Sequence, residues 1–390
     1  MQDPGLNHSS YDVVVVGARC AGAATALLLA RAGAKVLLID RQKRGADTVS
    51  THAIMRAGVL LLKRWGLLSE LMACGTPAIR RSTFHYGPDA VTVTIGSDHG
   101  VDFLCAPRRT VLDRLLVEAA ETTGADVHHD MSLIDLEFDG HGRVTGAVLK
   151  DAGGRTWTVS AGIVVGADGR QSTVARQVRA QTRIIGSGAS GYVYGYFAGL
   201  PDDGFHWHFG QGVAAGVIPT NHAQHCVFVA VPDRRFAAVF RGDLDAGFRG
   251  VLAANSPALA DGVARARLQG RLRGFAGGGG YLRQSYGPGW ALVGDAAYFK
   301  DPLTAHGITD ALRDAEFLAR AAIDGNPQAF VRYQEERDDL SLPLFAVTDE
   351  IASFEWDLEA AKQLHARLSA AMKRETERVA AFPARDALAA

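Results

Sequence analysis

A glycine turn follows the first apolar run of the chain and has the spacing of a nucleotide-binding loop. The run YDVVVVG ends at Gly17, and Gly22 stands at the last glycine position of the pattern G-x-G-x-x-G. Gly17 permits the tight turn, Gly22 lets helix and strand pack closely, and the N–H groups of the following helix bind a pyrophosphate. Arg19 replaces the middle glycine, where its guanidinium could touch a phosphate from the side. Taken alone, the stretch also fits a purely structural strand–helix unit.

Two later stretches place an aspartate at the end of an apolar run. In IVVGADGRQSTVAR, Asp168 stands at an expected strand end, just before a helix start. In ALVGDAAYFKDPLTAHGITDAL, Gly294 and Asp295 end a similar run, and Pro302 precedes a helix that we expect to open near Gly307. Both stretches strengthen the case for a bound cofactor.

The elements around the glycine turn form a strand–helix–strand unit. Residues 11–16 are rich in β-branched side chains and predict a strand buried on both faces. Residues 21–32 are rich in Ala and Leu and predict a helix that ends at Gly33. The run KVLLID, 35–40, predicts a second buried strand, which closes with Asp40 where an acidic residue accepts ribose hydroxyls. This order is that of a βαβ unit.

The rest of the chain alternates between helical and strand-forming patterns, so that one α/β domain is built from separated segments with β-rich segments inserted between them. The expected elements are a helical region over 49–72, antiparallel strands over 82–107, a helix and strand over 108–127, a meander over 132–166, a β-rich region over 187–282 with a helical insert at 243–273, and helices over 307–324, 326–339 and on to the C-terminus.

Composition excludes several classes of function. The chain has 390 residues, 47% of them hydrophobic, with a formal net charge of −1 and no long basic run. Binding to nucleic acid or to an anionic membrane is therefore not expected. The four cysteines are scattered without a CxxC spacing, which argues against a zinc site or a disulfide framework and favours the cytoplasm. We expect no membrane span, because no uncharged apolar stretch reaches ~18 residues.

At these motifs the chain resembles the FAD-dependent monooxygenases of the para-hydroxybenzoate hydroxylase type, which are related to geranylgeranyl reductases and flavin halogenases. That family carries a glycine turn, a GADG stretch and a GDAA stretch, and all three occur here in the family's order. The resemblance covers about residues 11–340. It implies an α/β fold with a Rossmann-like FAD-binding domain (three layers, mostly parallel sheet), an inserted β-rich substrate domain and C-terminal helices. The expected boundaries are 1–80, 107–180 and 283–340 for the FAD-binding domain, 81–106 and 181–282 for the substrate domain, and 341–390 for the C-terminal helices.

The resemblance also implies which residues hold FAD, without a covalent bond. Asp40 and Arg41 correspond to the adenosine end, and Asp295 to an aspartate that binds a ribityl hydroxyl. The backbone of 307–309 corresponds to a helix start facing the flavin ring, where N–H dipoles stabilise the anionic reduced flavin. The expected cofactor-binding residues are Gly17, Ala18, Arg19, Cys20, Ala21, Gly22, Asp40, Arg41, Arg56, Arg109, Asp168, Gly294, Asp295, Pro302, Gly307, Ile308 and Thr309.

Within this set, Arg56 and Asp168 correspond to residues near the phosphates, and Arg109 to a contact with the flavin's linker. The chain departs from the family where Tyr298 replaces the histidine of GDAAH, and where PLTAHGIT replaces PxxGxGxN. These departures lie beside the expected flavin ring, so they concern the reaction more than the cofactor.

Four histidines were considered as functional groups. His52 is expected either to contact the flavin pocket or to lie in a capped loop, and His306 either to handle a proton or to lie in a solvated loop. These two are the candidate catalytic residues, and no catalytic base is assigned. His206 and His208 share a strand face, but no carboxylate spacing accompanies them, so we expect sheet packing and no metal site.

The reaction that the resemblance implies is monooxygenation. NADPH or NADH would reduce FAD, molecular oxygen would form a flavin C4a-hydroperoxide, and a small aromatic or apolar metabolite would accept one oxygen atom. The alternative is FAD-dependent reduction of a C=C bond, because DPLTAHGITDAL is similar to the DPLTGxG form of geranylgeranyl reductases. A non-enzymatic cofactor-binding or sensor protein is the third hypothesis. The amphipathic segment after residue 353 could cover the core or mediate a homodimer.

Overall fold

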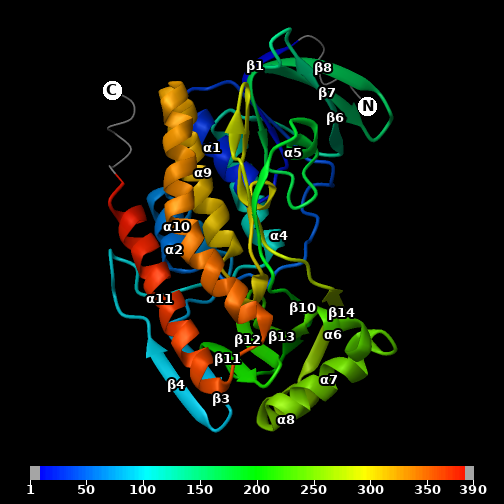
Figure 1. Ribbon diagram of the computed structural model, residues 1–390, viewed down its shortest axis with the longest axis vertical. Coiled ribbons are helices and arrows are strands. Elements are labelled where there is room, and N and C mark those ends of the chain that lie inside the picture. The colour runs from blue at the N-terminus through cyan, green and yellow to red at the C-terminus, as the bar shows by residue number, and fades with distance from the viewer. Residues whose placement is uncertain (1–8, 383–390) are drawn as a thin grey trace.

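The computed structural model describes residues 9–382, and Figure 1 shows a sheet flanked by long helices above a second sheet. The first sheet has the order β16-β17-β8-β1-β2-β5, with β7 paired to β8 and β6 paired to β7. Strands β17, β8, β1, β2 and β5 run parallel to their neighbours in that order. The strands are β1 (Ser10–Val16), β2 (Val36–Ile39), β5 (Asp126–His128), β6 (Met131–Phe138), β7 (Val144–Asp151), β8 (Thr156–Gly166), β16 (Tyr286–Gly287) and β17 (Trp290–Leu292).

Alternate residues of β1 face two different cores, as expected for a strand buried on both sides. Val13 and Val15 pack with the helices α1 (Cys20–Arg31), α4 (Arg109–Thr122) and α9 (Gly307–Asp324). Val14 and Val16 pack instead with the meander β6–β8 and with α5 (Thr173–Gln177). Helices, parallel sheet and meander are therefore the three layers, and the predicted fold class is confirmed.

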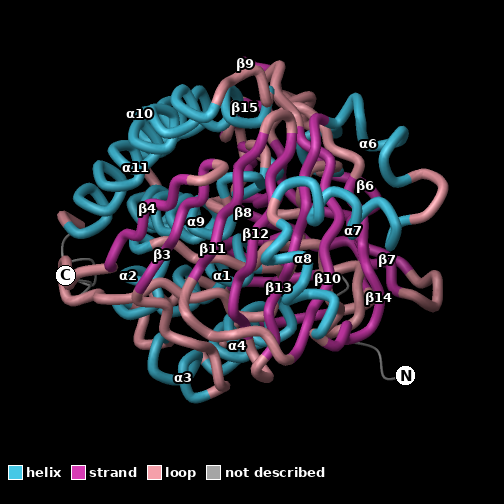
Figure 2. Tube along the Cα trace, turned by 90° about the horizontal axis from the view of Figure 1, so that it is seen from below, coloured by secondary structure: helices cyan, strands magenta, loops and turns pink. Residues whose placement is uncertain are grey.

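The second sheet has the order β14-β10-β13-β12-β11-β3-β4, which Figure 2 shows from below. One face packs on the C-terminal helices α10 (Pro327–Ser353) and α11 (Leu358–Ala380), and the other packs on α6–α8. The bounds are β3 (Arg81–Tyr86), β4 (Asp89–Thr94), β10 (Ser190–Ala198), β11 (Phe205–Gly210), β12 (Val213–Thr220), β13 (Gln224–Pro232), β14 (Arg267–Phe275), α6 (Asp233–Phe240), α7 (Leu244–Asn255) and α8 (Pro257–Arg265).

A short third sheet and two 3-10 turns connect these parts. Its order is β18-β15-β9, with β9 (Thr182–Ile185), β15 (Tyr281–Arg283) and β18 (Tyr298–Phe299). The turns η1 (Gly294–Ala296) and η2 (Pro302–Thr304) lie between β17 and α9. Among the described residues, no helix combines the length and apolar character that crossing a membrane requires.

Four predicted elements differ from those observed. The helical region predicted over 49–72 is a loop up to residue 55, followed by α2 (Arg56–Arg64) and α3 (Leu68–Ala73), because Gly66, with a φ of 75°, interrupts the helix. Residues 95–107 form only isolated bridges, not strands. The end of the insert predicted as helix is strand β14, because Leu268 and Leu272 pack on the α6–α8 side of the sheet. The helix predicted over 326–339 continues to Ser353 as α10.

Candidate cofactor cavity

A cavity of about 750 Å³ opens at the carboxyl ends of the parallel strands. Its walls come from the turn after β1, from the loop after β8 and from the segment between η1 and α9, which are the three motif stretches of the sequence. The volume lies in the range of small-molecule and cofactor sites. The predicted residues that line it are Gly17, Arg19, Cys20, Ala21, Asp40, Arg41, His52, Arg109, Asp168, Asp295, Pro302, Gly307 and Ile308.

The glycine turn has no room for side chains at its two glycines. A Cβ at Gly17 would lie 2.4 Å from the carbonyl oxygen of Ala167, and the φ of 107° already favours glycine. A Cβ at Gly22 would lie 1.8 Å from the carbonyl oxygen of Gly17. The middle position differs, because Arg19 is the N-cap residue of α1 with an ordinary φ of −88° and an extended backbone. The arginine therefore fits the turn without strain.

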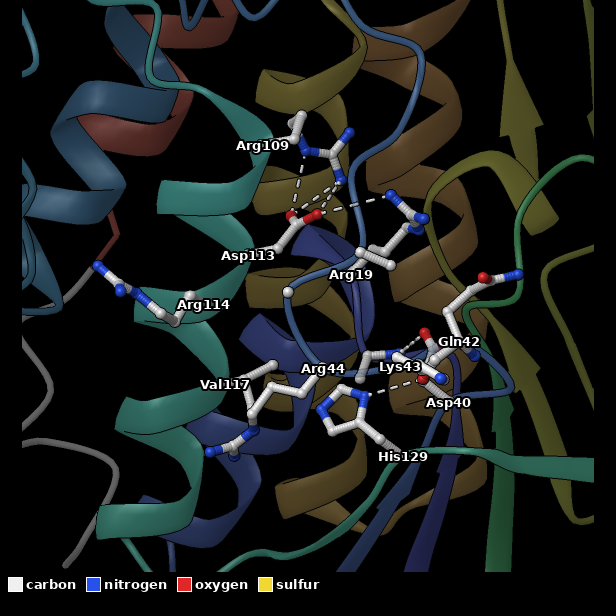
Figure 3. A pocket seen from close by; sticks show the side chains of 13 residues that line it. Arg19, Asp40, Gln42, Lys43, Arg44, Arg109, Asp113, Arg114, Val117 and His129 are labelled. Carbon is white, nitrogen blue, oxygen red and sulfur yellow. Dashed lines mark hydrogen bonds and ion pairs between the residues drawn. The ribbon is translucent and has the colours of Figure 1, made fainter. Parts of the chain in front are cut away.

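The side chain of Arg19 leans toward acidic and backbone partners at the mouth of the cavity. Its Nη1 lies 3.8 Å from Asp113 Oδ2, and its Nη2 lies 3.5 Å from the carbonyl oxygen of Asp47. Figure 3 shows Arg19 and Arg109 converging on Asp113 in a smaller cavity of about 30 Å³. Lys43, Arg44 and Arg114 also line this smaller cavity, so its rim is strongly basic.

Asp40 has a structural role that the sequence did not reveal. Its Oδ2 accepts the N–H of Ala18 at 2.8 Å, and its Oδ1 accepts the N–H of Gln42 at 2.7 Å. The buried carboxylate thus holds the glycine turn against the loop after β2. Contact with a ribose stays a prediction.

An arginine–carboxylate pair, Arg109 with Asp113, lies beside the cavity, and Arg109 itself lines the wall. Arg109 is buried and binds Asp113 through both Nε and Nη2, at 3.1 and 2.9 Å from Oδ1. Burial raises the pKa of Asp295, while Arg109, Arg170 and Lys300 act in the opposite direction. The cavity therefore combines an Asp295 carboxylate with nearby cations, a donor and acceptor set that suits hydroxyls and phosphates.

Asp168 leaves one oxygen atom unpaired. Its Oδ2 accepts the N–H of Thr173 at 2.6 Å at the start of α5, but its Oδ1 is buried without a hydrogen-bond partner within the described chain. A buried polar atom without a partner costs free energy unless a ligand satisfies it. Together with the cradle at Gly17 and Gly22, this atom shows that the residues present fit an FAD molecule.

Several predicted residues lie outside the wall of the large cavity. Ala18 lines the smaller cavity, while Gly22 and Gly294 are not among the wall residues. Arg56 donates from Nη1 to the carbonyl oxygens of Gly96 and Val101, so it ties α2 to a surface loop. Thr309 accepts the N–H of Met55 through Oγ1 at 2.9 Å, which anchors α9 to the loop before α2.

His52 lies on the wall, in a left-handed backbone conformation with a φ of 66°. Its Nε2 bonds the hydroxyl of Tyr196, and its Nδ1 is buried without a partner among the described residues. Burial, with Arg108 and Arg109 acting in the same direction, lowers the pKa of His52 to about 3. The ring is therefore neutral near pH 7 and acts as a hydrogen-bonding group. Arg108 stacks 3.5 Å from the centre of the Tyr196 ring.

His306 lies behind the wall, in a buried cluster of charged side chains at the start of α9. Its Nε2 lies 2.8 Å from Glu375 Oε2, at ion-pair distance, and its Nδ1 lies 3.2 Å from Asp310 Oδ1. Lys300 contacts the second oxygen of Asp310, and Arg313 contacts Glu375 Oε1 at 2.5 Å. Burial lowers the pKa of His306 to about 4, so this ring is also neutral near pH 7. A solvated loop is therefore wrong for His306.

Sequence reasoning missed the residues that close the cavity. Tyr192 from β10 and Phe275 from β14 line it from the second sheet, and Phe299 and Lys300 line it from the segment before α9. Arg170 lies between two rings, 4.5 Å from Phe275 and 4.7 Å from Phe299. In the sequence, Lys300 follows the GDAA motif and Arg170 follows the GADG motif. This proximity is the sequence signal that could have identified them as cavity residues.

A family model described as an FAD binding domain matches residues 10–234, more than half of the chain. The chain belongs to this FAD-binding family. It is thus a flavoprotein oxidoreductase, as the motifs predicted. Its cofactor is FAD. That the glycine turn, Asp295 and the start of α9 bind this FAD stays a prediction.

Individual relatives differ in what their names say they do. This flavoprotein is 25% identical over 325 residues to digeranylgeranylglycerophospholipid reductase 1 of Methanococcoides burtonii, which covers 82% of this chain and 76% of the relative. It is 33% identical over 187 residues to kynurenine 3-monooxygenase of Salinispora tropica, which covers 45% of this chain and 39% of the relative. Its fold matches the flavin-dependent brominase Bmp2 with a TM-score of 0.80 at 18% identity, over 95% of this chain and 93% of the other.

Proposed function

We propose that this flavoprotein is a monooxygenase that consumes NADPH or NADH and places one atom of molecular oxygen in a small aromatic or apolar metabolite. The overall reaction balances as substrate–H, O2, NAD(P)H and H⁺ giving substrate–OH, NAD(P)⁺ and H2O. The FAD supplies the redox chemistry when it is bound, by taking two electrons from the nicotinamide and activating oxygen.

The observation that carries this proposal is the aromatic end of the cavity. Tyr192, Phe275, Tyr298 and Phe299 all line the wall, and all except Phe275 are buried. Tyr192 packs against Phe275, and the guanidinium of Arg170 lies between Phe275 and Phe299. Aromatic walls exclude water, which protects a reactive oxygen species from loss and favours apolar substrates. The cavity of about 750 Å³ lies in the size range of small-molecule and cofactor sites, which supports a small substrate beside the FAD.

The chain's own polar groups would hold and orient the substrate. Nδ1 of His52 is buried on the wall without a partner in the described chain, so it would exchange a hydrogen bond with a substrate hydroxyl. Tyr196 fixes the ring through Nε2, which determines the direction of Nδ1. The N–H groups at the start of α9, at Gly307 and Ile308, favour negative charge at that side of the cavity.

Reduction of a C=C bond is the second candidate. It is favoured by the match to the digeranylgeranylglycerophospholipid reductase, which spans 82% of this chain. A reductase would transfer the electrons to the double bond and would need no oxygen.

Oxygen dependence separates the two candidates. Purified holoprotein is mixed with NADPH or NADH and with a panel of small aromatic compounds and polyprenyl lipids, in air and under anaerobic conditions. A monooxygenase uses one O2 for each nicotinamide oxidised and places ¹⁸O from ¹⁸O2 in the product. Continued product formation without oxygen, with a saturated double bond and no ¹⁸O, contradicts monooxygenation and supports the reductase.

A further inference from the structure

A second group of histidines lies outside the lining of the cofactor cavity, on the face of the second sheet that packs against α6–α8. His206 and His208 alternate along β11, and the parallel register of β3 places His85 directly beside His208. The same two residues pair with Val217 and Ala215 of β12, which belong to the face covered by α6–α8. Figure 2 shows β3, β11 and β12 following one another across this sheet. The three rings are half-buried.

The ring nitrogens lie close enough together to share a metal ion. Nε2 of His85 lies 3.1 Å from Nδ1 of His206, and the rings of His85 and His208 stack with centres 4.1 Å apart. One nitrogen from each of the three rings lies within 4.8 Å of the others. Two nitrogen ligands on a tetrahedral ion, each at ~2.0–2.1 Å, are about 3.3 Å apart. The ring planes are nearly parallel, at 2° between His85 and His208 and 20–21° between each of them and His206. Because an imidazole lone pair lies in the plane of its ring, the rings would have to turn about their Cβ–Cγ bonds before all three lone pairs converge on one ion.

A carboxylate supports one of the rings from behind. Oδ1 of Asp203 lies 2.8 Å from Nε2 of His206, the nitrogen on the far side of the ring from His85. This contact fixes the proton on Nε2 and leaves the lone pair of Nδ1 directed at the other histidines. Ligating histidines in proteins have this arrangement, in which a carboxylate orients the ring and raises its basicity. The prediction of no accompanying carboxylate is wrong, because Asp203 stands in the loop before β11, three residues before His206.

We propose that His85, His206 and His208 bind a divalent transition-metal ion of the zinc class, with Asp203 as the residue that orients His206. Imidazole nitrogens are the ligands that such ions prefer, and a fourth position is left to water. The charged or titratable groups that act on His85 and His208 are the other histidines and Asp203, with no Lys or Arg among them in the described chain. The ion would link β3 to β11, whose histidines His85 and His206 are 121 residues apart in the sequence.

Metal retention tests the site directly. Holoprotein without a polyhistidine tag is dialysed against micromolar ZnCl2 and then against buffer, and bound zinc is measured by elemental analysis. We expect about one zinc ion per chain, with a raised melting temperature. His85→Gln and His208→Gln should each abolish stoichiometric retention, while Asp203→Asn should weaken zinc affinity by about 10–100-fold and still saturate at high zinc.

The controls separate this site from general histidine binding and from misfolding. His141→Gln changes an exposed histidine in the turn between β6 and β7 and should retain zinc like the unaltered protein. The flavin absorbance of every variant should be unchanged, because these histidines do not line the cofactor cavity within the described residues. Absence of zinc from the unaltered protein, or equal retention by His85→Gln, would overturn the proposal.

Discussion

The two histidine clusters of this molecule look alike by distance and differ in their charge. His306, Asp310 and Glu375 bring potential ligand atoms as close together as His85, His206 and His208 do. The first cluster is fully buried, and Lys300 and Arg313 already contact its carboxylates. The second cluster is half-buried, and the neighbouring charge acting on it is the carboxylate of Asp203. The distance between potential ligand atoms is therefore not enough to predict metal binding. The cations that already pair with the cluster must be taken into account as well.

The largest effect is expected from removing the buried cation of the first cluster. Arg313 has no exposed surface and pairs with the buried carboxylates of Asp310, Asp314 and Glu375. Arg313→Met would remove the guanidinium from all three, although Asp310 keeps Lys300 and Glu375 keeps His306 as partners. We expect a loss of about 3–5 kcal/mol in the free energy of unfolding, measured by urea denaturation. The control is Arg374→Met, which breaks the exposed pair with Asp339 and should change little. Equal losses of unfolding free energy in the two variants would show that the buried pairs stabilise the fold no more than the exposed pair does.

Acid should destabilise the folded protein by protonating Glu375 in the first cluster. Burial alone would raise the pKa of Glu375, but His306 and Arg313 outweigh burial and lower it to about 2. Because the folded pKa lies below the unfolded value, the ionised form stabilises the fold above about pH 4.5, and this contribution is lost as the pH falls toward 2. Between pH 5 and pH 2, the free energy of unfolding of Glu375→Gln should therefore fall by roughly 2–3 kcal/mol less than that of the unaltered protein.

Acid unfolding curves followed by circular dichroism measure this difference. Glu336→Gln, at the surface pair with Arg378, is the matched control and should follow the unaltered protein. If the curve of Glu375→Gln also coincides with that of the unaltered protein, the buried pairs do not hold Glu375 ionised.

Lys300 connects the first cluster to the cofactor cavity, which the second cluster does not reach. Burial, with Arg313, lowers the pKa of Lys300 to about 7, so its charge is present below pH 7 and disappears above it. A cation on the cavity wall stabilises anionic reduced flavin. Lys300→Met should lower the flavin midpoint potential at pH 6 by roughly 20 mV, the equivalent of about 1 kcal/mol for two electrons. The difference should vanish at pH 8.5.

Spectroelectrochemical titration of the holoprotein at both pH values measures this shift. Lys362→Met changes an exposed lysine of α11 and should leave the potential unchanged. A shift that is equal at pH 6 and pH 8.5 would show that the charge of Lys300 is not its cause.

The smallest effect is expected from placing a cation beside the second cluster. Ala90 on β4 stands directly opposite His85 in an antiparallel pair, so a side chain there lies on the same face. Ala90→Lys should weaken zinc binding by a few-fold at low salt, and Ala90→Glu should strengthen it by a similar factor. Calorimetric titration at two salt concentrations checks both signs. Identical affinities in the two variants would show that charge at this face does not govern the site.

Short-range patterns predicted the local structure of the glycine turn, which one contiguous stretch builds. The turn from Gly17 to Gly22 was predictable because its requirement for glycine arises from neighbours that the βαβ order fixes. Arg56 corresponds by resemblance to a residue near a phosphate, and its guanidinium donates to the carbonyl oxygens of Gly96 and Val101. Its contact with a phosphate stays a prediction. Strand β14 was missed because its arginines mask the alternation of Leu268 and Leu272.

The sequence by itself determined the βαβ unit, the three flavin motifs and the α/β class, because local side-chain volume and backbone freedom dictate them. Tertiary structure alone decided that His306 meets Glu375 and that His85 meets His206, 121 residues away. Those meetings depend on strand register and helix packing, which are set by the whole core. The periodicity of the sequence does not indicate which buried side chains will contact one another.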